Sequence, residues 1–121
     1  MKPKYEFFKN FAYARAGLKE VFKKEKSFRL EVFFFVALFM LLCFLPYPLW
    51  AKIAIVASML VPLIVELLNS AIEGVVDMVT SEYHELAKYA KDAAAAAVMF
   101  SLIFSAAVWI GFIVYFWSEK G

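Results

Sequence analysis

Five polar side chains recur at helical spacing within a mostly apolar stretch of the sequence: Glu66, Asn69, Ser70, Glu73 and Asp77. At about 100° per residue these positions fall within a narrow arc of one helix face, and we call them the acidic stripe. Ionisable groups inside a membrane span are costly unless they are paired or hydrated, so they commonly mark functional sites. Polar groups that only join two helices are the alternative, but five on one stripe favour a site that binds a cation or moves a proton.

A polar segment, residues 80–92, follows the acidic stripe and carries charges that complement it. His84, Lys88 and Lys91 recur at helical spacing, and two lysines beside carboxylates could hold an anion next to a divalent cation. A solvated connecting helix whose charges pair with each other explains the spacing equally well. His84 is the single histidine, and we interpret it as a surface hydrogen-bonding residue rather than a metal ligand. Ser81 is the expected N-cap of the helix that begins there.

Three long apolar runs must position these groups. The chain has 121 residues, 64% of them hydrophobic, and a mean hydropathy of +0.72, which is far from the composition of a soluble globule. About 20 apolar residues cross a bilayer core, and residues 31–51, 53–79 and 93–117 each reach that length. The sequence therefore predicts an all-α membrane protein with three transmembrane helices in a single domain, residues 1–121.

Residues 5–27 are predicted to form a further, amphipathic helix. Phe7, Phe11, Leu18 and Phe22 share one face at helical spacing, whereas lysines occupy the other face. A basic face opposite a phenylalanine-rich face is typical of a helix that lies in the membrane surface. A helix that binds a partner or packs into a core is the alternative.

The distribution of charge predicts orientation and excludes some functions. Eleven of the thirteen lysine and arginine residues lie in the N-terminal arm or in residues 80–92, and both regions should therefore face the cytoplasm. The net charge of +2 does not indicate a nucleic-acid partner, the single Cys43 allows no disulfide within the chain, and the four glycines form no phosphate-binding loop. Three helices do not enclose the acidic stripe well, so symmetric copies of the chain are expected to supply the missing walls.

Two motifs carry a resemblance to a known family. Residues 66–98 read ELLNSAIEGVVDMVTSEYHELAKYAKDAAAAAV, and residues 25–31 read EKSFRLE. Together they closely resemble the prokaryotic diacylglycerol kinase family, small membrane-embedded lipid kinases that act on diacylglycerol or undecaprenol. The resemblance implies transfer of the γ-phosphate of ATP to a lipid hydroxyl, with Mg²⁺, by a homotrimer in the bacterial inner membrane.

The resemblance also implies roles for individual residues. Glu66 matches the general base, and Asn69 matches a neighbour that orients the acceptor. Glu25 and Glu73 resemble the metal ligands of the family, and Glu31 and Ser70 match positions that bind the lipid substrate. The positions that match the ATP site are Tyr13, Gly17, Glu82, His84, Glu85, Lys91 and Asp92.

Two other functions are alternatives to a diacylglycerol kinase. The His84-Glu85 pair resembles the diacylglycerol branch more than the undecaprenol branch, and an undecaprenol kinase with the same mechanism is the alternative. A third hypothesis is a protein without enzymatic activity that conducts protons or cations along the acidic stripe. Glu66 lies two turns, or roughly 10 Å, from Glu73 along a straight helix, so the two are not expected to share one metal. Pro62 lies one turn before Glu66 and lacks a backbone N–H, so a kink of the helix beside Glu66 is one expectation.

Overall fold

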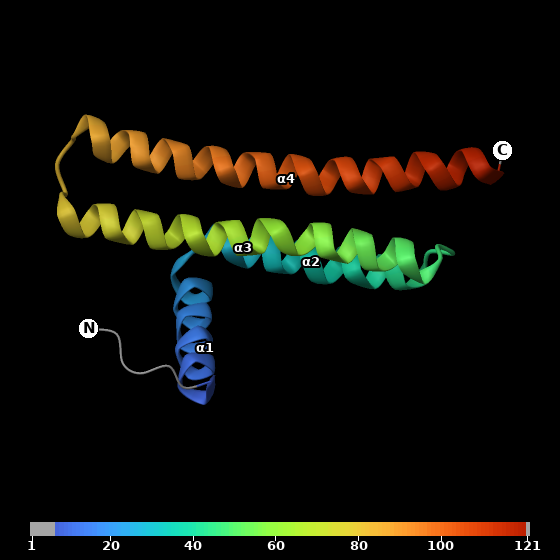
Figure 1. Cartoon of the computed structure of the whole chain (residues 1–121), viewed down its shortest axis with the longest axis horizontal. Helices are drawn as coiled ribbons and strands as arrows, with labels where there is room; N and C mark the ends of the chain where they lie inside the picture. Colours follow the sequence, from blue (N-terminus) through green and yellow to red (C-terminus); the bar gives the residue numbers. More distant parts are fainter. Residues whose placement is uncertain (1–6, 121) are drawn as a thin grey trace.

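The chain is all-helical in the computed structural model, which describes residues 7–120. The four helices are α1 (Phe7–Lys24), α2 (Lys26–Phe44), α3 (Leu49–Val79) and α4 (Glu85–Lys120). Helix α3 packs antiparallel against both α2 and α4, and α1 extends away from these three rods to one side (Figure 1). The three rods are long and apolar enough to cross a membrane. The predicted class, three spans preceded by an N-terminal helix, is therefore confirmed.

Helix α1 is shorter than the predicted segment, whose first two residues, 5 and 6, lie outside the described part of the chain. The helix ends at Lys24 because Glu25 adopts an extended conformation, with φ −106° and ψ 109°. An exposed pair on its surface, Glu20 Oε2 and Lys24 Nζ at 2.8 Å, follows the i,i+4 pattern. The hydrogen bond and the charge of Lys24 lower the pKa of Glu20.

Helix α2 ends at Phe44, before the predicted limit at residue 51, and α3 starts at Leu49. The reason lies in the Pro46-Tyr47-Pro48 turn, because proline lacks a backbone N–H and the residue before it avoids helical geometry. Lys52 closes the turn from the α3 side by donating from Nζ to the carbonyl of Cys43, 3.2 Å away. A terminal carbonyl of α2 is thereby satisfied.

Helix α3 continues through Pro62 without a break in its helical assignment. Its 31 residues give a length of about 46 Å at 1.5 Å per residue, more than the ~30 Å hydrocarbon core needs. Glu66 and Asn69 are buried, Ser70 and Glu73 are half-buried, and Asp77 is exposed. The acidic stripe therefore runs from the interior of the bundle to its surface.

Helix α4 begins at Glu85, eight residues before the predicted span of residues 93–117, and the predicted N-cap at Ser81 is wrong. His84 is the capping residue, because its Nδ1 accepts a hydrogen bond of 3.0 Å from the backbone N–H of Leu86. Ser81 lies in the preceding turn. A side-chain acceptor for the second N–H of a helix is what an N-cap provides, and imidazole here takes the place of the usual hydroxyl.

Only a small part of the apolar surface is buried within one chain. The core cluster consists of Leu42, Ile55, Met59 and Trp109, contributed by α2, α3 and α4. Large apolar side chains elsewhere face outward; Phe33, for example, is 65% exposed. Such a surface is compatible with lipid or with further protein as its surroundings.

Candidate functional site

Glu66 lies at the centre of the site, on the face of α3 that meets the start of α2. Its side chain is only 4% exposed. The Oε1 atom accepts two hydrogen bonds, one from Ser27 Oγ of α2 at 3.3 Å and one from Asn69 Nδ2 of α3 at 3.4 Å. Two neutral donors from two helices thus hold one carboxylate oxygen, Oε1.

A second carboxyl group lies against Glu66. Glu31, one turn into α2, interacts directly with the Glu66 carboxyl. Its own Oε1 is buried and receives no hydrogen bond from the described residues. Two carboxylates in contact repel each other unless a proton or a cation lies between them. Asn69 contributes another buried acceptor, Oδ1, that has no partner among residues 7–120, so a hydrogen-bond donor such as a hydroxyl group would satisfy it.

Glu25 is held at the corner between α1 and α2. It occupies the N-cap position of α2, but its carboxylate makes no capping bond. Instead, Oε1 accepts a hydrogen bond of 3.1 Å from Ser70 Oγ of α3. The contact brings Glu25 to the acidic stripe, and the positive end of the α2 dipole lies beside its negative charge.

Glu73, half-buried one turn beyond Asn69, completes a group of carboxylates around Ser70. Its charge interacts with those of Glu25, Glu66 and Lys91. Within residues 7–120, no three His, Cys, Asp or Glu side chains are grouped so as to hold a metal by themselves. Glu25 and Glu73 nevertheless fit Mg²⁺, because this ion usually takes one or two carboxylates and completes its octahedron with phosphate oxygens and water.

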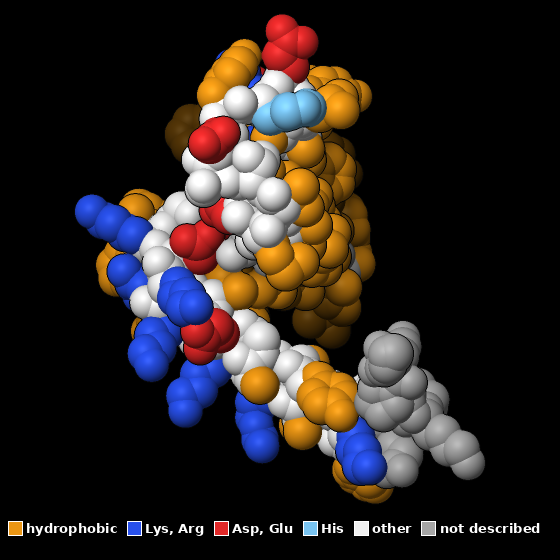
Figure 2. Space-filling model, turned by 90° about the vertical axis from the view of Figure 1, so that its left-hand side faces the viewer, with side chains coloured by type: hydrophobic (Ala, Val, Ile, Leu, Met, Phe, Trp, Pro, Cys, Tyr) orange, Lys and Arg blue, Asp and Glu red, His pale blue; other side chains and the backbone are white. Residues whose placement is uncertain are grey.

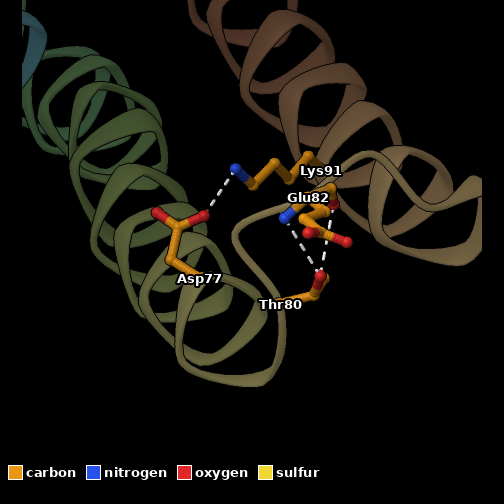
Figure 3. A network of polar contacts seen from close by, with 4 residues as sticks. All are labelled: Asp77, Thr80, Glu82 and Lys91. Atoms are coloured by element: carbon orange, nitrogen blue, oxygen red, sulfur yellow. Dashed lines mark hydrogen bonds and ion pairs between the residues drawn. The ribbon is translucent and has the colours of Figure 1, made fainter.

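The turn between α3 and α4 forms a separate polar pocket. Lys91 Nζ pairs with Asp77 Oδ1 at 2.7 Å, joining the end of the acidic stripe to α4 (Figure 3). Thr80 Oγ1 accepts from the backbone N–H of Glu82 at 3.1 Å and orders the turn. The cavity beside these contacts has a volume of about 420 Å³. Lys91 and Asp77 are 41% and 63% exposed, so water or a phosphate group can compete for the lysine.

The predicted ATP-site residues fall into two groups that one chain does not bring together. Glu82, His84, Lys91 and Asp92 line the 420 Å³ pocket. Glu85 follows in the first turn of α4, where it is exposed. Asp92 is itself paired with Lys88 of the same helix.

Tyr13 and Gly17 form the other group, on α1. Gly17 lines a groove of about 770 Å³ between α1 and α3, whereas Tyr13 is exposed and lies outside that groove. Helix α1 makes no helix contact with α4 in the described part of the chain. Lysine and arginine side chains gather along α1 where it extends away from the α3–α4 turn (Figure 2).

Sequence reasoning missed two residues that shape the site. Ser27 donates to Glu66, and Arg29 donates from Nη1 to the last carbonyls of α1, those of Phe22 and Lys23, at 2.9 Å each. Both belong to the EKSFRLE motif, but the motif does not reveal which helix each side chain contacts. Asp77 was included in the acidic stripe without a partner, and the structure pairs it with Lys91.

Comparison with known proteins identifies the family of the chain. Residues 12–113 match the family model described as prokaryotic diacylglycerol kinase. The chain belongs to this family. The predicted family membership is therefore confirmed, and it makes the chain a membrane lipid kinase.

Relatives within the prokaryotic diacylglycerol kinase family cover nearly the whole chain. The diacylglycerol kinase of Escherichia coli K12 is 36% identical over 109 residues, which are 90% of this chain and 87% of that protein. The diacylglycerol kinase of Haemophilus influenzae is 40% identical over 103 residues, 85% of this chain and 87% of that protein. The diacylglycerol kinase of Synechocystis is 40% identical over 103 residues, 84% of this chain and 58% of that protein.

Proposed function

We propose that this chain transfers the γ-phosphate of ATP to the free hydroxyl of diacylglycerol and so forms phosphatidic acid. The observation that carries the proposal is the buried Glu66 carboxylate, held through one oxygen by Ser27 and Asn69, within a member of the prokaryotic diacylglycerol kinase family. The relatives are named as diacylglycerol kinases, which supports diacylglycerol over undecaprenol as the acceptor.

In the proposed reaction, Glu66 accepts the proton of the lipid hydroxyl on Oε2, the carboxylate oxygen that Ser27 and Asn69 do not contact. The hydroxyl oxygen forms a bond to the γ-phosphorus, the bond from that phosphorus to the bridging oxygen breaks, and ADP leaves. Asn69 Oδ1, a buried acceptor without a partner in the described part of the chain, orients the hydroxyl. Phosphoryl transfer depends mainly on such positioning and on charge neutralisation.

The acceptor lipid needs an apolar approach to the carboxyl pair, and a cavity beside Glu31 offers one. A cavity of about 250 Å³ between α2, α3 and α4 includes Glu31 and is otherwise lined mostly by apolar side chains such as Phe34, Leu38 and Leu63. Acyl chains in this cavity would lie in the hydrocarbon layer, with the hydroxyl at the polar end. Glu31 and Ser70 are the proposed lipid-binding residues.

Glu25 and Glu73 are the proposed ligands of Mg²⁺, which would neutralise charge on the transferred phosphoryl group when bound. The proposed ATP contacts are Tyr13, Gly17, Glu82, His84, Glu85, Lys91 and Asp92. Because α1 does not contact α4 within the described residues, a nucleotide that touches both groups would lie between two subunits. This separation, together with the exposed apolar surface, supports a homotrimer with shared active sites.

The proposed location is the bacterial inner membrane, with the N-terminus and the α3–α4 turn on the cytoplasmic side. The bias of lysine and arginine toward these two regions supports that orientation. ATP, which is cytoplasmic, would then reach the polar end of the acidic stripe. The whole chain is proposed to act as one kinase domain.

The deciding experiment offers diacylglycerol and undecaprenol side by side to purified protein in detergent micelles, with γ-labelled ATP and Mg²⁺. We expect labelled phosphatidic acid, lost in Glu66→Gln. Labelling of undecaprenol alone would keep the mechanism and change the acceptor. Absence of label on either lipid, with the oligomer intact, would refute the proposed function. Ion flux in sealed vesicles would then favour a protein that conducts protons or cations along the acidic stripe.

A further inference from the structure

Arg29 has contacts at the α1–α2 corner that none of the proposed catalytic or binding roles uses. Its Nη1 atom donates to the carbonyls of both Phe22 and Lys23 at 2.9 Å. These carbonyls belong to the last turn of α1, which lacks internal donors. A charged donor at this position also interacts favourably with the negative end of the α1 dipole.

Glu25 lies at the same corner, where backbone hydrogen bonds join it to α1 on one side and to α2 on the other. The N–H of Glu25 donates to the carbonyl of Val21 at 2.8 Å, and the carbonyl of Glu25 accepts from the N–H of Arg29 at 3.2 Å. Because Glu25 is the one residue between two helices, the angle between α1 and α2 sets where its carboxylate points. The Arg29 side chain spans that angle from α2 back to α1.

We propose that Arg29 is a positioning residue, which holds α1 against the start of α2 and thereby aims the Glu25 carboxylate at Ser70 and Glu73. The inference rests on the proposed function in one respect, the role of Glu25 toward Mg²⁺ and ATP. Arginine suits the task because its guanidinium is always charged and planar and carries several donors in a fixed geometry. Lysine would offer a point charge on a flexible stem.

The competing explanation is that Arg29 only adds positive charge near the membrane surface, where α1 already carries several lysines. Lys23 separates the two explanations, because its side chain is exposed and lies on the same last turn. Lys23→Gln removes one positive charge and keeps the backbone carbonyl that Arg29 contacts. Arg29→Gln removes one positive charge together with the guanidinium bridge.

The test combines a structural measurement with an activity measurement on the full chain. Spin labels are placed on α1 by Lys19→Cys and on α3 by Val75→Cys, both exposed positions, after Cys43→Ala removes the native thiol. Labelled chains are diluted with unlabelled protein so that distances within one chain dominate. The distance distribution and the Mg²⁺ concentration for half-maximal phosphate transfer are then compared among the parent, Arg29→Gln, Arg29→Lys and Lys23→Gln.

We expect Arg29→Gln to broaden the α1–α3 distance distribution. The half-maximal Mg²⁺ concentration should rise about tenfold, the lower limit for the loss of the two charge-assisted hydrogen bonds of Arg29. Arg29→Lys should lie between Arg29→Gln and the parent, and Lys23→Gln should match the parent. An unchanged distribution in Arg29→Gln, or an equal effect of Lys23→Gln on Mg²⁺ dependence, would overturn the proposal. If the parent transfers no phosphate, the proposed function fails, and the distance distributions alone decide whether Arg29 holds the corner.

Discussion

Replacing Glu66 by glutamine should separate activity from stability in this protein. The amide of glutamine keeps the size of the side chain and one oxygen that can still accept from Ser27 and Asn69. It can no longer accept the hydroxyl proton. Removing a general base lowers rates by roughly 10²–10⁴-fold, so phosphate transfer by Glu66→Gln should fall to about 1% of the parent or below.

The stability of Glu66→Gln should be preserved or increased. In the parent, the Glu66 carboxyl lies against that of Glu31, and Glu31 Oε1 has no hydrogen-bond donor among the described residues. The new amide NH₂ group can donate a hydrogen bond to Glu31. A net hydrogen bond contributes about 1 kcal/mol, so a gain of that order in the free energy of unfolding is expected.

Glu66→Asp provides the matched comparison, because it keeps the charge and shortens the side chain by one bond of about 1.5 Å. The distance of 3.3 Å to Ser27 Oγ then exceeds hydrogen-bonding range. A displacement of about 1 Å at a reacting group can cost ~100-fold in rate, so Glu66→Asp should also be nearly inactive.

The assays are transfer of labelled γ-phosphate to diacylglycerol in micelles, and thermal unfolding followed by circular dichroism in the same detergent. Glu66→Gln should combine very low transfer with an unchanged or higher melting temperature. More than a tenth of parental activity in Glu66→Gln would refute its role as base. A loss of several kcal/mol in stability would instead show that the carboxyl pair itself supports the fold.

Three further predictions concern the residues around the site. Lys91→Gln should raise KM for ATP at least tenfold by steady-state kinetics. It should change the free energy of unfolding by less than about 1 kcal/mol, because the pair of Lys91 with Asp77 is exposed; a clear loss of stability with an unchanged KM for ATP would contradict this. Ser27→Ala should lower kcat about fivefold, the effect of one net hydrogen bond, with unchanged KM values, and Ser27→Thr should restore it; a raised KM for lipid would point to a substrate contact instead. His84→Ala should lower thermal stability by about 1 kcal/mol through loss of the α4 cap, whereas His84→Asn should retain the cap; equal melting temperatures for the two variants would refute the capping role.

The sequence by itself determined the class of the protein, the number of spans and the identity of the acidic stripe. Membrane spans are visible in a sequence because length and hydropathy must match the bilayer. Helical periodicity places Glu66, Asn69 and Glu73 on one face whatever surrounds them. The ends of the helices were harder to predict from the sequence. The cap of α4, for example, comes from His84 rather than from Ser81, the residue with the usual capping side chain.

The tertiary structure decided which polar groups meet across helices. Neither the contact of Ser27 with Glu66 nor that of Ser70 with Glu25 follows from spacing, since the pairs are separated by 39 and 45 residues. Both contacts depend on how α2 and α3 pack. The pairing of Lys91 with Asp77 likewise depends on the turn that returns α4 along α3. Periodicity reports the face of a single helix, whereas contacts between helices depend on the angle and register of packing, which no local pattern contains.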